Sequence, residues 1–438
     1  MTIASYRHVG LLLNPLFLHS FSLGMEPHFT QPPDAGELAP QLNPTRKIRI
    51  MFVDDDPMVV RGLARNMSMM GVKMDISVRT SAEEALKTLE GELVDVIITD
   101  LCMPGTDGTA LLNEVRMRYP TVFRFILSGE ANPEVVLQAS RLAHQYLSKP
   151  CETAVLHRTI VETLARFSTI KNPEVAKTIS LLEGVPSRQA SLAEFIRLLN
   201  DSSVSLDTIA ASLKMDPGLS ARLLKVANST YFGHSGSVET LDDAIGLLGM
   251  DMIVSMAATH KLFAVTPPPA ASGLKLDVLW EHCVYVSSLV RHVGHKLKVP
   301  QSILREAGTA ALLHDIGKLI LAYAVPSAFA AARTRAMGDH MPGWQAEYFI
   351  FGDHHAEIGG CLLKLWGLPS GVVEAVSTHH TPHHSAEVSV GPATLVHIAD
   401  MLAHAGTEEG ATTFLDVAHL KALNLPEDLD YWLGLRPD

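Results

Sequence analysis

The chain has 438 residues, a length that corresponds to two or three domains of ordinary size. Hydrophobic residues make up 47% of it, yet the sequence has no run of about 18 uninterrupted apolar residues that would predict a membrane span. Lysine and arginine number 35 against 47 aspartates and glutamates, which gives a net charge of −12. This acidic balance argues against non-specific binding to nucleic acid or to an anionic membrane.

Residues 1–45 are expected to be a disordered extension. Arg7 precedes an apolar stretch, as in a secretory signal peptide, but Asn14, Pro15 and His19 interrupt that stretch and no small-residue cleavage site follows it cleanly. An over-long reading frame with Met25 as the true start would explain the segment equally well.

Cysteine usage indicates a reducing compartment. The four cysteines are far apart and form no CxxC pair: Cys102, Cys151, Cys283 and Cys361. This pattern argues against a disulfide framework and against a cysteine zinc knuckle. We therefore expect a cytoplasmic protein.

Residues 46–168 alternate short apolar runs with helical periodicity. The runs predict strands at Ile48–Val53, Ile76–Val78, Val94–Thr99, Phe123–Leu127 and Tyr146–Leu147. The segments between and after them predict helices at Met58–Met70, Ala82–Glu90, Thr109–Tyr119, Pro133–Ala143 and Thr153–Phe167. Five such repeats predict a doubly wound α/β domain with a five-stranded parallel sheet. A linker over 169–176 and an all-helical domain over 177–438 are expected to follow.

Polar residues stand at the predicted strand ends of this first domain. Asp54, Asp55 and Asp56 follow the first strand, and Asp100 follows the third. In a doubly wound sheet these two ends meet at the switch point, where clustered carboxylates favour Mg²⁺. Ser128 ends the fourth strand, and Lys149 follows the fifth. A hydroxyl and an ammonium beside a carboxylate suit phosphoryl transfer onto that carboxylate. A solvated acidic loop would not explain all four positions.

At these residues the domain resembles the receiver domain of two-component response regulators. The resemblance runs through Val53-Asp54-Asp55, Asp100-Leu101-Cys102-Met103-Pro104, Asp107-Gly108, Leu127-Ser128-Gly129 and Lys149-Pro150. It implies that Asp100 is phosphorylated by a partner sensor histidine kinase in a bacterial cell. It also implies that Mg²⁺ is held by Asp54, Asp55, Asp100 and the backbone carbonyl of Cys102. Ser128, Tyr146 and Lys149 would be the switch residues.

Histidines are concentrated in the helical domain, where 14 of the 21 lie between His282 and His419. His282 faces the apolar stripe of a helix predicted over Val278–Leu297. The pair His314-Asp315, with Lys318 one turn later, lies in a second apolar helix predicted over Ala310–Leu321. A single inward histidine is more often a satisfied core residue than a ligand, but further candidates follow. Seven residues on several helices could surround one or two metal ions: His282, His314, Asp315, His355, His379, His380 and Asp400.

This spacing resembles the HD superfamily of metal-dependent phosphohydrolases, which implies iron, manganese or zinc and makes Lys318 a candidate catalytic residue. The surrounding motifs resemble the HDOD family more specifically. They are Asp216-Pro217-x-Leu219, Ala227-Asn228-Ser229, Ala244-Ile245-x-Leu247-Leu248-Gly249, Gly352-x-His354-His355 and Trp366-Gly367-Leu368-Pro369. HDOD domains are usually regarded as non-catalytic signalling modules, so the resemblance implies binding to an unknown downstream protein, with homodimerisation left open.

The sequence has features of two other kinds of output domain. A nearly full ligand set favours a metal-dependent phosphodiesterase acting on a cyclic dinucleotide or nucleotide, although the Asp-Gly-x-Gly-Tyr-Pro run of the cyclic-dinucleotide-cleaving relatives is missing after His380. Residues 206–228 have the outline of a DNA-binding helix-turn-helix. However, residues 171–265 hold 8 basic against 10 acidic side chains, a net charge of −2, which disfavours DNA reading.

Overall fold

The computed structural model describes residues 47–437 apart from 71–73, 106, 130–131, 200, 202, 230–231, 233–236, 259–267 and 406–414. The expected extension over 1–45 lies outside these residues. Among the described helices, none is both long enough and apolar enough to cross a membrane.

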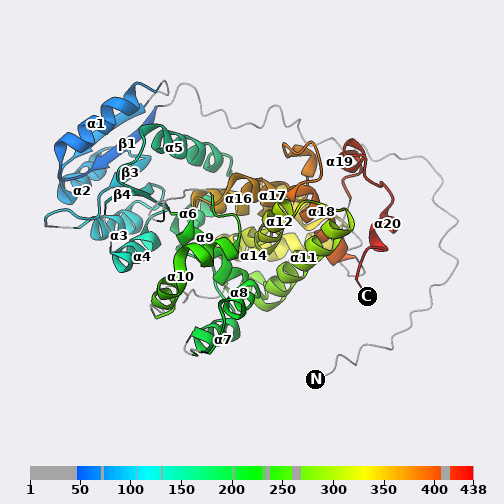
Figure 1. Cartoon of the computed structure of the whole chain (residues 1–438). Helices are drawn as coiled ribbons and strands as arrows, with labels where there is room; N and C mark the ends of the chain where they lie inside the picture. The colour runs from blue at the N-terminus through cyan, green and yellow to red at the C-terminus, as the bar shows by residue number, and fades with distance from the viewer. Residues whose placement is uncertain are drawn as a thin grey trace. The chain divides into compact units, whose positions relative to one another are not determined.

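Five parallel strands form one sheet in the order β2-β1-β3-β4-β5 (Figure 1), which confirms the predicted doubly wound fold. The strands are β1 (Ile48–Val53), β2 (Met74–Arg79), β3 (Val96–Thr99), β4 (Phe123–Ser128) and β5 (Gln145–Ser148). The helices that alternate with them are α1 (Pro57–Ser68), α2 (Ala82–Gly91), α3 (Gly108–Arg118), α4 (Pro133–Leu142) and α5 (Thr153–Phe167). All five predicted strands and all five predicted helices are present, with ends that differ by no more than two residues.

Alternation along the strands builds a core on each face of the sheet. Ile50 and Phe52 of β1 pack with α1 and α5, whereas Met51 and Val53 pack with α2, α3 and α4. Burial on both faces explains why the strands read as nearly continuous apolar runs.

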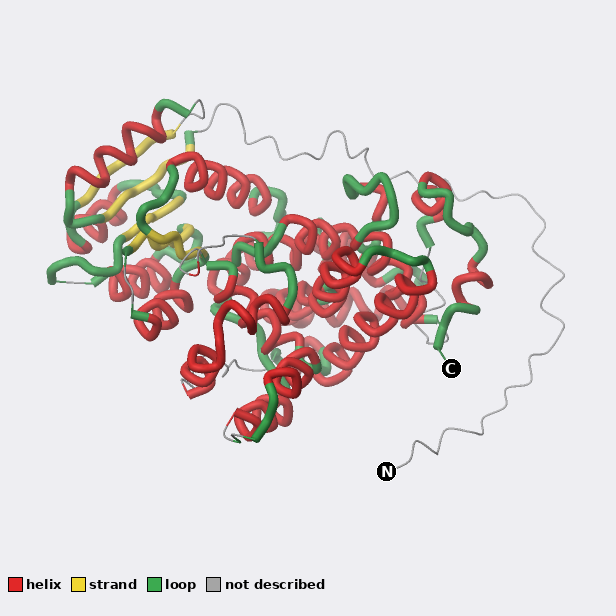
Figure 2. The backbone as a smooth tube through the Cα atoms, in the orientation of Figure 1, coloured by secondary structure: helices red, strands yellow, loops and turns green. Residues whose placement is uncertain are grey.

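All described residues after β5 are helical or irregular (Figure 2). Helix α6 (Pro173–Leu181) begins inside the expected linker. The α-helices that follow are α7 (Gln189–Leu199), α8 (Leu206–Lys214), α9 (Pro217–Ala227), α10 (Leu241–Ala258), α11 (Leu276–Lys296), α12 (Gln301–Leu313), α13 (Ile316–Ala324), α14 (Pro326–Gly338), α15 (Gly343–Phe351), α16 (His355–Leu365), α17 (Ser370–Thr378), α18 (Pro392–His404), α19 (Val417–Ala422) and α20 (Leu429–Leu433).

One predicted helix is wrong. The segment Ala310–Leu321 is not continuous, because α12 ends at Leu313 and α13 begins at Ile316. His314 and Asp315 occupy the break. The two candidate ligands are therefore presented from the corner between two helices.

The second helix of the segment with the outline of a helix-turn-helix is part of the core. Every residue of α9 is buried, including Arg222 and Lys225. A DNA-reading helix must expose one face to the major groove, and α9 has no such face.

Asp216 fixes the start of α9. Its carboxylate is fully buried and accepts hydrogen bonds from the backbone nitrogens of Leu219 (3.0 Å) and Arg188 (2.8 Å). It thereby caps α9 and holds the chain that leads into α7.

Asp216→Ala should lower the free energy of unfolding by about 2–4 kcal/mol, because it removes a helix cap and leaves a second buried donor unpaired. Urea-induced unfolding of the full chain measures the change. Ser205→Ala, which removes the exposed cap of α8, is the matched control and should cost about 1 kcal/mol. Equal costs for the two variants would contradict the role given to Asp216.

Candidate functional site

The carboxyl edge of the sheet gathers the predicted acidic pocket. Val53 and Thr99 are register partners in β1 and β3, so the residues that follow them, Asp54 and Asp100, lie side by side. Carboxylate oxygens of Asp54, Asp55 and Asp100 lie within 4.8 Å of one another. Such a set of oxygen donors fits Mg²⁺, which prefers carboxylates and retained water.

Ser128 and Lys149 contact the central carboxylate, as their positions predicted. The Ser128 hydroxyl donates to Oδ1 of Asp100, and the Lys149 ammonium lies 2.6 Å from Oδ2 of Asp100 and 2.6 Å from Oδ2 of Asp54. Burial alone would raise the pKa of Asp100, but the hydrogen bonds from Lys149 and Ser128 lower it below its usual value. The carboxylate is therefore ionised and available as a nucleophile.

Of the remaining two predicted residues, Cys102 lies next to this pocket and Tyr146 lies in the core of the receiver. The backbone nitrogen of Cys102 lies 3.4 Å from Oδ1 of Asp100, and its side chain is exposed. Tyr146 of β5 is buried, and 3% of its surface is accessible.

In the helical domain, four predicted ligands converge on one point. Nε2 of His282 lies 3.2 Å from Nε2 of His314, 3.0 Å from Oδ1 of Asp400 and 3.6 Å from Oδ2 of Asp315. Nε2 of His314 lies 3.5 Å from each of those two carboxylate oxygens. Donors that share a metal at 2.0–2.2 Å stand about 3.0–3.5 Å apart, so this spacing fits a metal ion. We call these four residues the first position.

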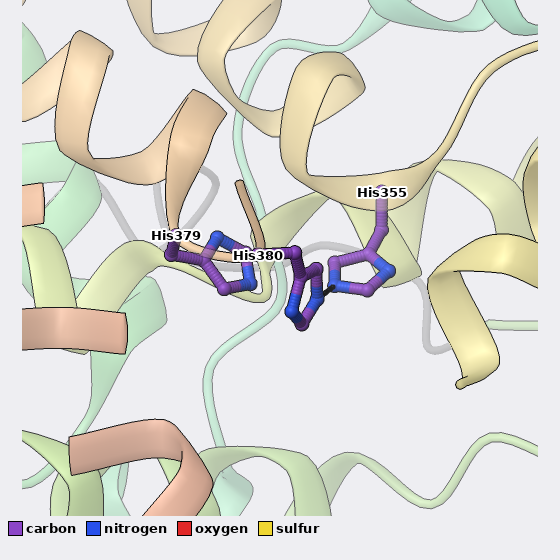
Figure 3. Close-up of side chains that lie close together, drawn as sticks. All are labelled: His355, His379 and His380. Carbon is purple, nitrogen blue, oxygen red and sulfur yellow. Dashed lines mark hydrogen bonds between the residues drawn. The ribbon is translucent and has the colours of Figure 1, made fainter. Parts of the chain in front are cut away.

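The other three predicted ligands form a neighbouring group, which we call the second position. Figure 3 shows the rings of His355, His379 and His380 turned towards one another, with 2.9 Å between Nε2 of His355 and Nε2 of His380. Oδ1 of Asp315 lies 3.2 Å from Nε2 of His355. The two oxygens of Asp315 thus face the two positions, as in a bridging carboxylate.

Hydrogen bonds to the backbone orient two of the rings. Nδ1 of His314 donates to the carbonyl of Ala311 (2.7 Å), and Nδ1 of His379 donates to that of Val376 (2.8 Å). Each ring therefore turns Nε2 towards the centre. Nε2 of His379 is buried and has no hydrogen-bond partner among the described residues, as expected of an atom placed for a metal.

The centre is deeply buried and its carboxylates are charged. Burial would raise the pKa of Asp315, but the charges of His314 and Lys318 hold it well below its usual range. Burial lowers the pKa values of His379 and His380, which leaves these imidazoles neutral. Neutral imidazole and ionised carboxylate are the forms that bind iron, manganese or zinc.

Lys318, the candidate catalytic residue, lies beside the first position. Its ammonium is 2.7 Å from Oδ2 of Asp315, the oxygen that faces His282 and His314. A cation at this place could contact an oxygen of a bound phosphate as well as Asp315.

Gly317 brings the ligand-bearing helices together. A methyl group on Gly317 would lie 1.9 Å from the carbonyl oxygen of His355 and 2.9 Å from the backbone nitrogen of Gly359. Only glycine therefore allows α13 to approach α16 so closely. This approach places Asp315 against His355.

Two residues near the centre were missed from the sequence. His404, one turn after Asp400 on α18, has Nε2 3.3 Å from Oδ1 of Asp400. Glu347 of α15 accepts from Nδ1 of His355 at 2.7 Å. The spacing of Asp400 and His404 could have revealed the first, but Glu347 is brought in by tertiary packing alone.

Comparison with known families identifies both parts of the chain. The family model of the response regulator receiver domain matches residues 50–161, and that of the HDOD domain matches residues 185–382. The chain contains a receiver domain followed by an HDOD domain.

Curated relatives match parts of the chain. An uncharacterized protein of Treponema pallidum is 22% identical over 246 residues, which is 53% of this chain and 47% of the relative. The heme response regulator HssR of Staphylococcus aureus is 27% identical over 128 residues, 29% of this chain and 56% of that protein. The hydrogenase transcriptional regulatory protein HoxA of Bradyrhizobium diazoefficiens is 26% identical over 174 residues, 36% of this chain and 35% of that protein. The chain spans between about a third and just over half of the length of these relatives.

Solved structures are similar at low identity. The response regulator MmoQ of Methylococcus capsulatus is 22% identical, with a TM-score of 0.42 over 57% of this chain and 98% of that one. A virulence factor of Campylobacter jejuni is 17% identical, with a TM-score of 0.48 over 61% of this chain and 95% of that one.

Gly317 allows the ligand-bearing helices α13 and α16 of the HDOD domain to pack closely. Gly317→Ala should destabilise the full chain by about 1–3 kcal/mol, because the methyl group must displace backbone rather than a flexible side chain. Gly246→Ala in α10 is the control, since its methyl group would meet nothing within 4 Å and should be neutral or slightly stabilising. Urea midpoints measure both, and a midpoint for Gly317→Ala at or above that of the unsubstituted chain would contradict the packing described.

Proposed function

We propose that this response regulator is phosphorylated on Asp100 by a sensor histidine kinase in a bacterial cytoplasm. The observation that carries the proposal is the ionised Asp100 carboxylate held between Ser128 and Lys149. One oxygen of Asp100 attacks the phosphoryl group, the bond to the kinase histidine breaks, and the Lys149 ammonium offsets the charge of the phosphoryl oxygens. Mg²⁺, held by Asp54, Asp55, Asp100 and the carbonyl of Cys102, would supply further charge neutralisation.

The phosphoryl group would change the position of the switch residues. Once Asp100 is modified, the Ser128 hydroxyl gains a phosphoryl oxygen as acceptor, and Tyr146 moves with it. Tyr146 lies on β5 and packs with Val136 and Ala139 of α4, so the change would reach the face of the receiver formed by α4, β5 and α5. One of two arrangements of this face is then favoured.

Helix α16 is a physical link between the receiver and the metal-ligand cluster. Its first residue is His355, and Lys364 near its other end lies 2.5 Å from Glu162 of α5. Arg166 of α5 also donates to Ser377, two residues before His379. These contacts support a route by which the receiver acts on the HDOD domain.

Two outputs remain for the HDOD domain. The family resemblance supports a protein-interaction module that binds a downstream protein or a second copy of the chain. The intact ligand set favours a second candidate, a metal-dependent hydrolase of a cyclic dinucleotide or nucleotide phosphodiester. Iron, manganese or zinc at the two positions would activate water and polarise a phosphoryl oxygen, while Lys318 would hold the phosphate.

Asp100→Asn should abolish labelling by acetyl phosphate, because an amide cannot form the acyl phosphate. A phosphate-affinity gel run with Mg²⁺ measures the label. Asp75→Asn, at an exposed carboxylate of β2, is the matched control and should label like the unsubstituted chain. Label that persists on Asp100→Asn would exclude Asp100 as the acceptor.

Elemental mass spectrometry should find about two equivalents of iron, manganese or zinc per chain. The double variant His314→Ala with Asp315→Ala should lose them, because it removes donors from both positions. His295→Ala, at an exposed histidine of α11, should keep them, and circular dichroism confirms that each variant is folded. Equal metal in all three proteins would contradict the proposed centre.

The same double variant separates the two outputs. A hydrolase predicts release of a linear dinucleotide from a cyclic one, which the variant abolishes. If the domain is an interaction module, no linear dinucleotide should be released. The folded variant should then still pull down the partner.

A further inference from the structure

Glu347 is a carboxylate buried behind the metal-ligand cluster. It lies on α15, and only 3% of its surface is accessible. One oxygen, Oε2, accepts two hydrogen bonds from the same residue, from the backbone nitrogen of His355 at 2.8 Å and from its ring Nδ1 at 2.7 Å. Both contacts place Oε2 as a hydrogen-bond acceptor for His355.

This contact decides which nitrogen of His355 is available to a metal. Oε2 of Glu347 already accepts the backbone N–H of His355, so the ring Nδ1 beside it acts as the second donor and carries a hydrogen. Nε2 then points to the centre, 3.2 Å from Oδ1 of Asp315. A lone pair and a carboxylate oxygen repel at that distance unless a proton or a metal ion stands between them.

The hydrogen-bond partner of Nδ1 distinguishes His355 from His314 and His379. Nδ1 of His314 and of His379 donates to neutral backbone carbonyls. A carboxylate partner increases the basicity of the ligating nitrogen and fixes the ring more strongly. His355 should therefore be the strongest imidazole donor of the second position.

Helix α15 supports the second position from a further side chain. Trp344, one turn before Glu347, has its ring stacked on that of His380 at 5.8 Å between centroids. The ligands of the first position lie on α11, at the α12–α13 corner and on α18. A change on α15 should thus act on one position and leave the other intact.

We propose that Glu347 is a positioning residue that sets the metal affinity of the second position through Nδ1 of His355. The inference rests on the metal centre in the proposed function. It adds that the metal affinity of one position depends on Glu347 and that of the other does not.

The test is a titration of the metal-free full chain with Zn²⁺ in competition with a chromophoric chelator. The unsubstituted chain should bind two Zn²⁺. Glu347→Gln, which keeps the shape of the side chain and an oxygen acceptor, should bind one Zn²⁺ with unchanged affinity and the other about 10–100-fold more weakly. Glu357→Gln is the matched control, because this half-exposed carboxylate on α16 lies 3.8 Å from His354 and should leave both affinities unchanged.

Two readouts separate positioning from a general structural role. The urea midpoint of Glu347→Gln in the absence of metal should fall by no more than a neutral hydrogen-bond exchange costs, about 1 kcal/mol. The visible absorption of the Co²⁺-substituted chain should change for one of its two ions only. If Glu347→Gln does not fold, Glu347→Asp, which withdraws the charge by one methylene group, must show the same selective loss.

The outcomes that overturn the inference are distinct from those that overturn the metal centre. Two unchanged affinities in Glu347→Gln, or equal weakening of both, would refute the positioning role while the centre stands. An unsubstituted chain that binds no Zn²⁺ at either position would refute the centre and the inference together.

Discussion

The helical half of this molecule is organised around two buried carboxylates. Asp315 and Asp400 are almost fully buried, and ionised groups in such surroundings are costly unless cations and hydrogen bonds compensate them. Imidazole nitrogens approach both carboxylates, and the Lys318 ammonium adds to them at Asp315. The break between α12 and α13 and the close approach at Gly317 are the backbone features that make this clustering possible.

In the receiver, the charge of the clustered carboxylates is compensated in a different way. Its carboxylates lie at the open edge of a sheet, where the Lys149 ammonium bridges Asp54 and Asp100. The Lys149 and Asp100 side chains keep 26% and 12% of their surface accessible, which suits the proposed phosphorylation of Asp100. The more deeply buried helical centre suits the metal that is proposed for it.

Much of this arrangement could be predicted from local sequence, because the strand ends of a doubly wound sheet place Asp54, Asp100, Ser128 and Lys149 by topology alone. The local structure of the helical centre could not be predicted in the same way. Apolar periodicity runs through His314 and Asp315 without a break, so it predicted one helix where the chain turns a corner.

The supporting residues of the centre show where sequence reasoning ends. His404 follows Asp400 by one helical turn and could have been inferred from that spacing. Glu347 and His355 lie on different helices, so helical spacing does not relate them. Only the packing of α15 against the start of α16 brings Glu347 to His355. Residues that orient ligands leave weaker patterns than the ligands themselves, since many local sequences can supply one buried acceptor.

Asp315 is proposed to offer one carboxylate oxygen to each of two metal positions. Anomalous X-ray scattering from crystals of the Zn²⁺-loaded chain, measured on both sides of the zinc absorption edge, tests it directly. The account predicts two peaks about 3.5–4 Å apart, one beside His282 and His314 and one beside His355, with the Asp315 carboxylate between them. A centre without anomalous density, or a single peak out of contact with Asp315, would contradict it.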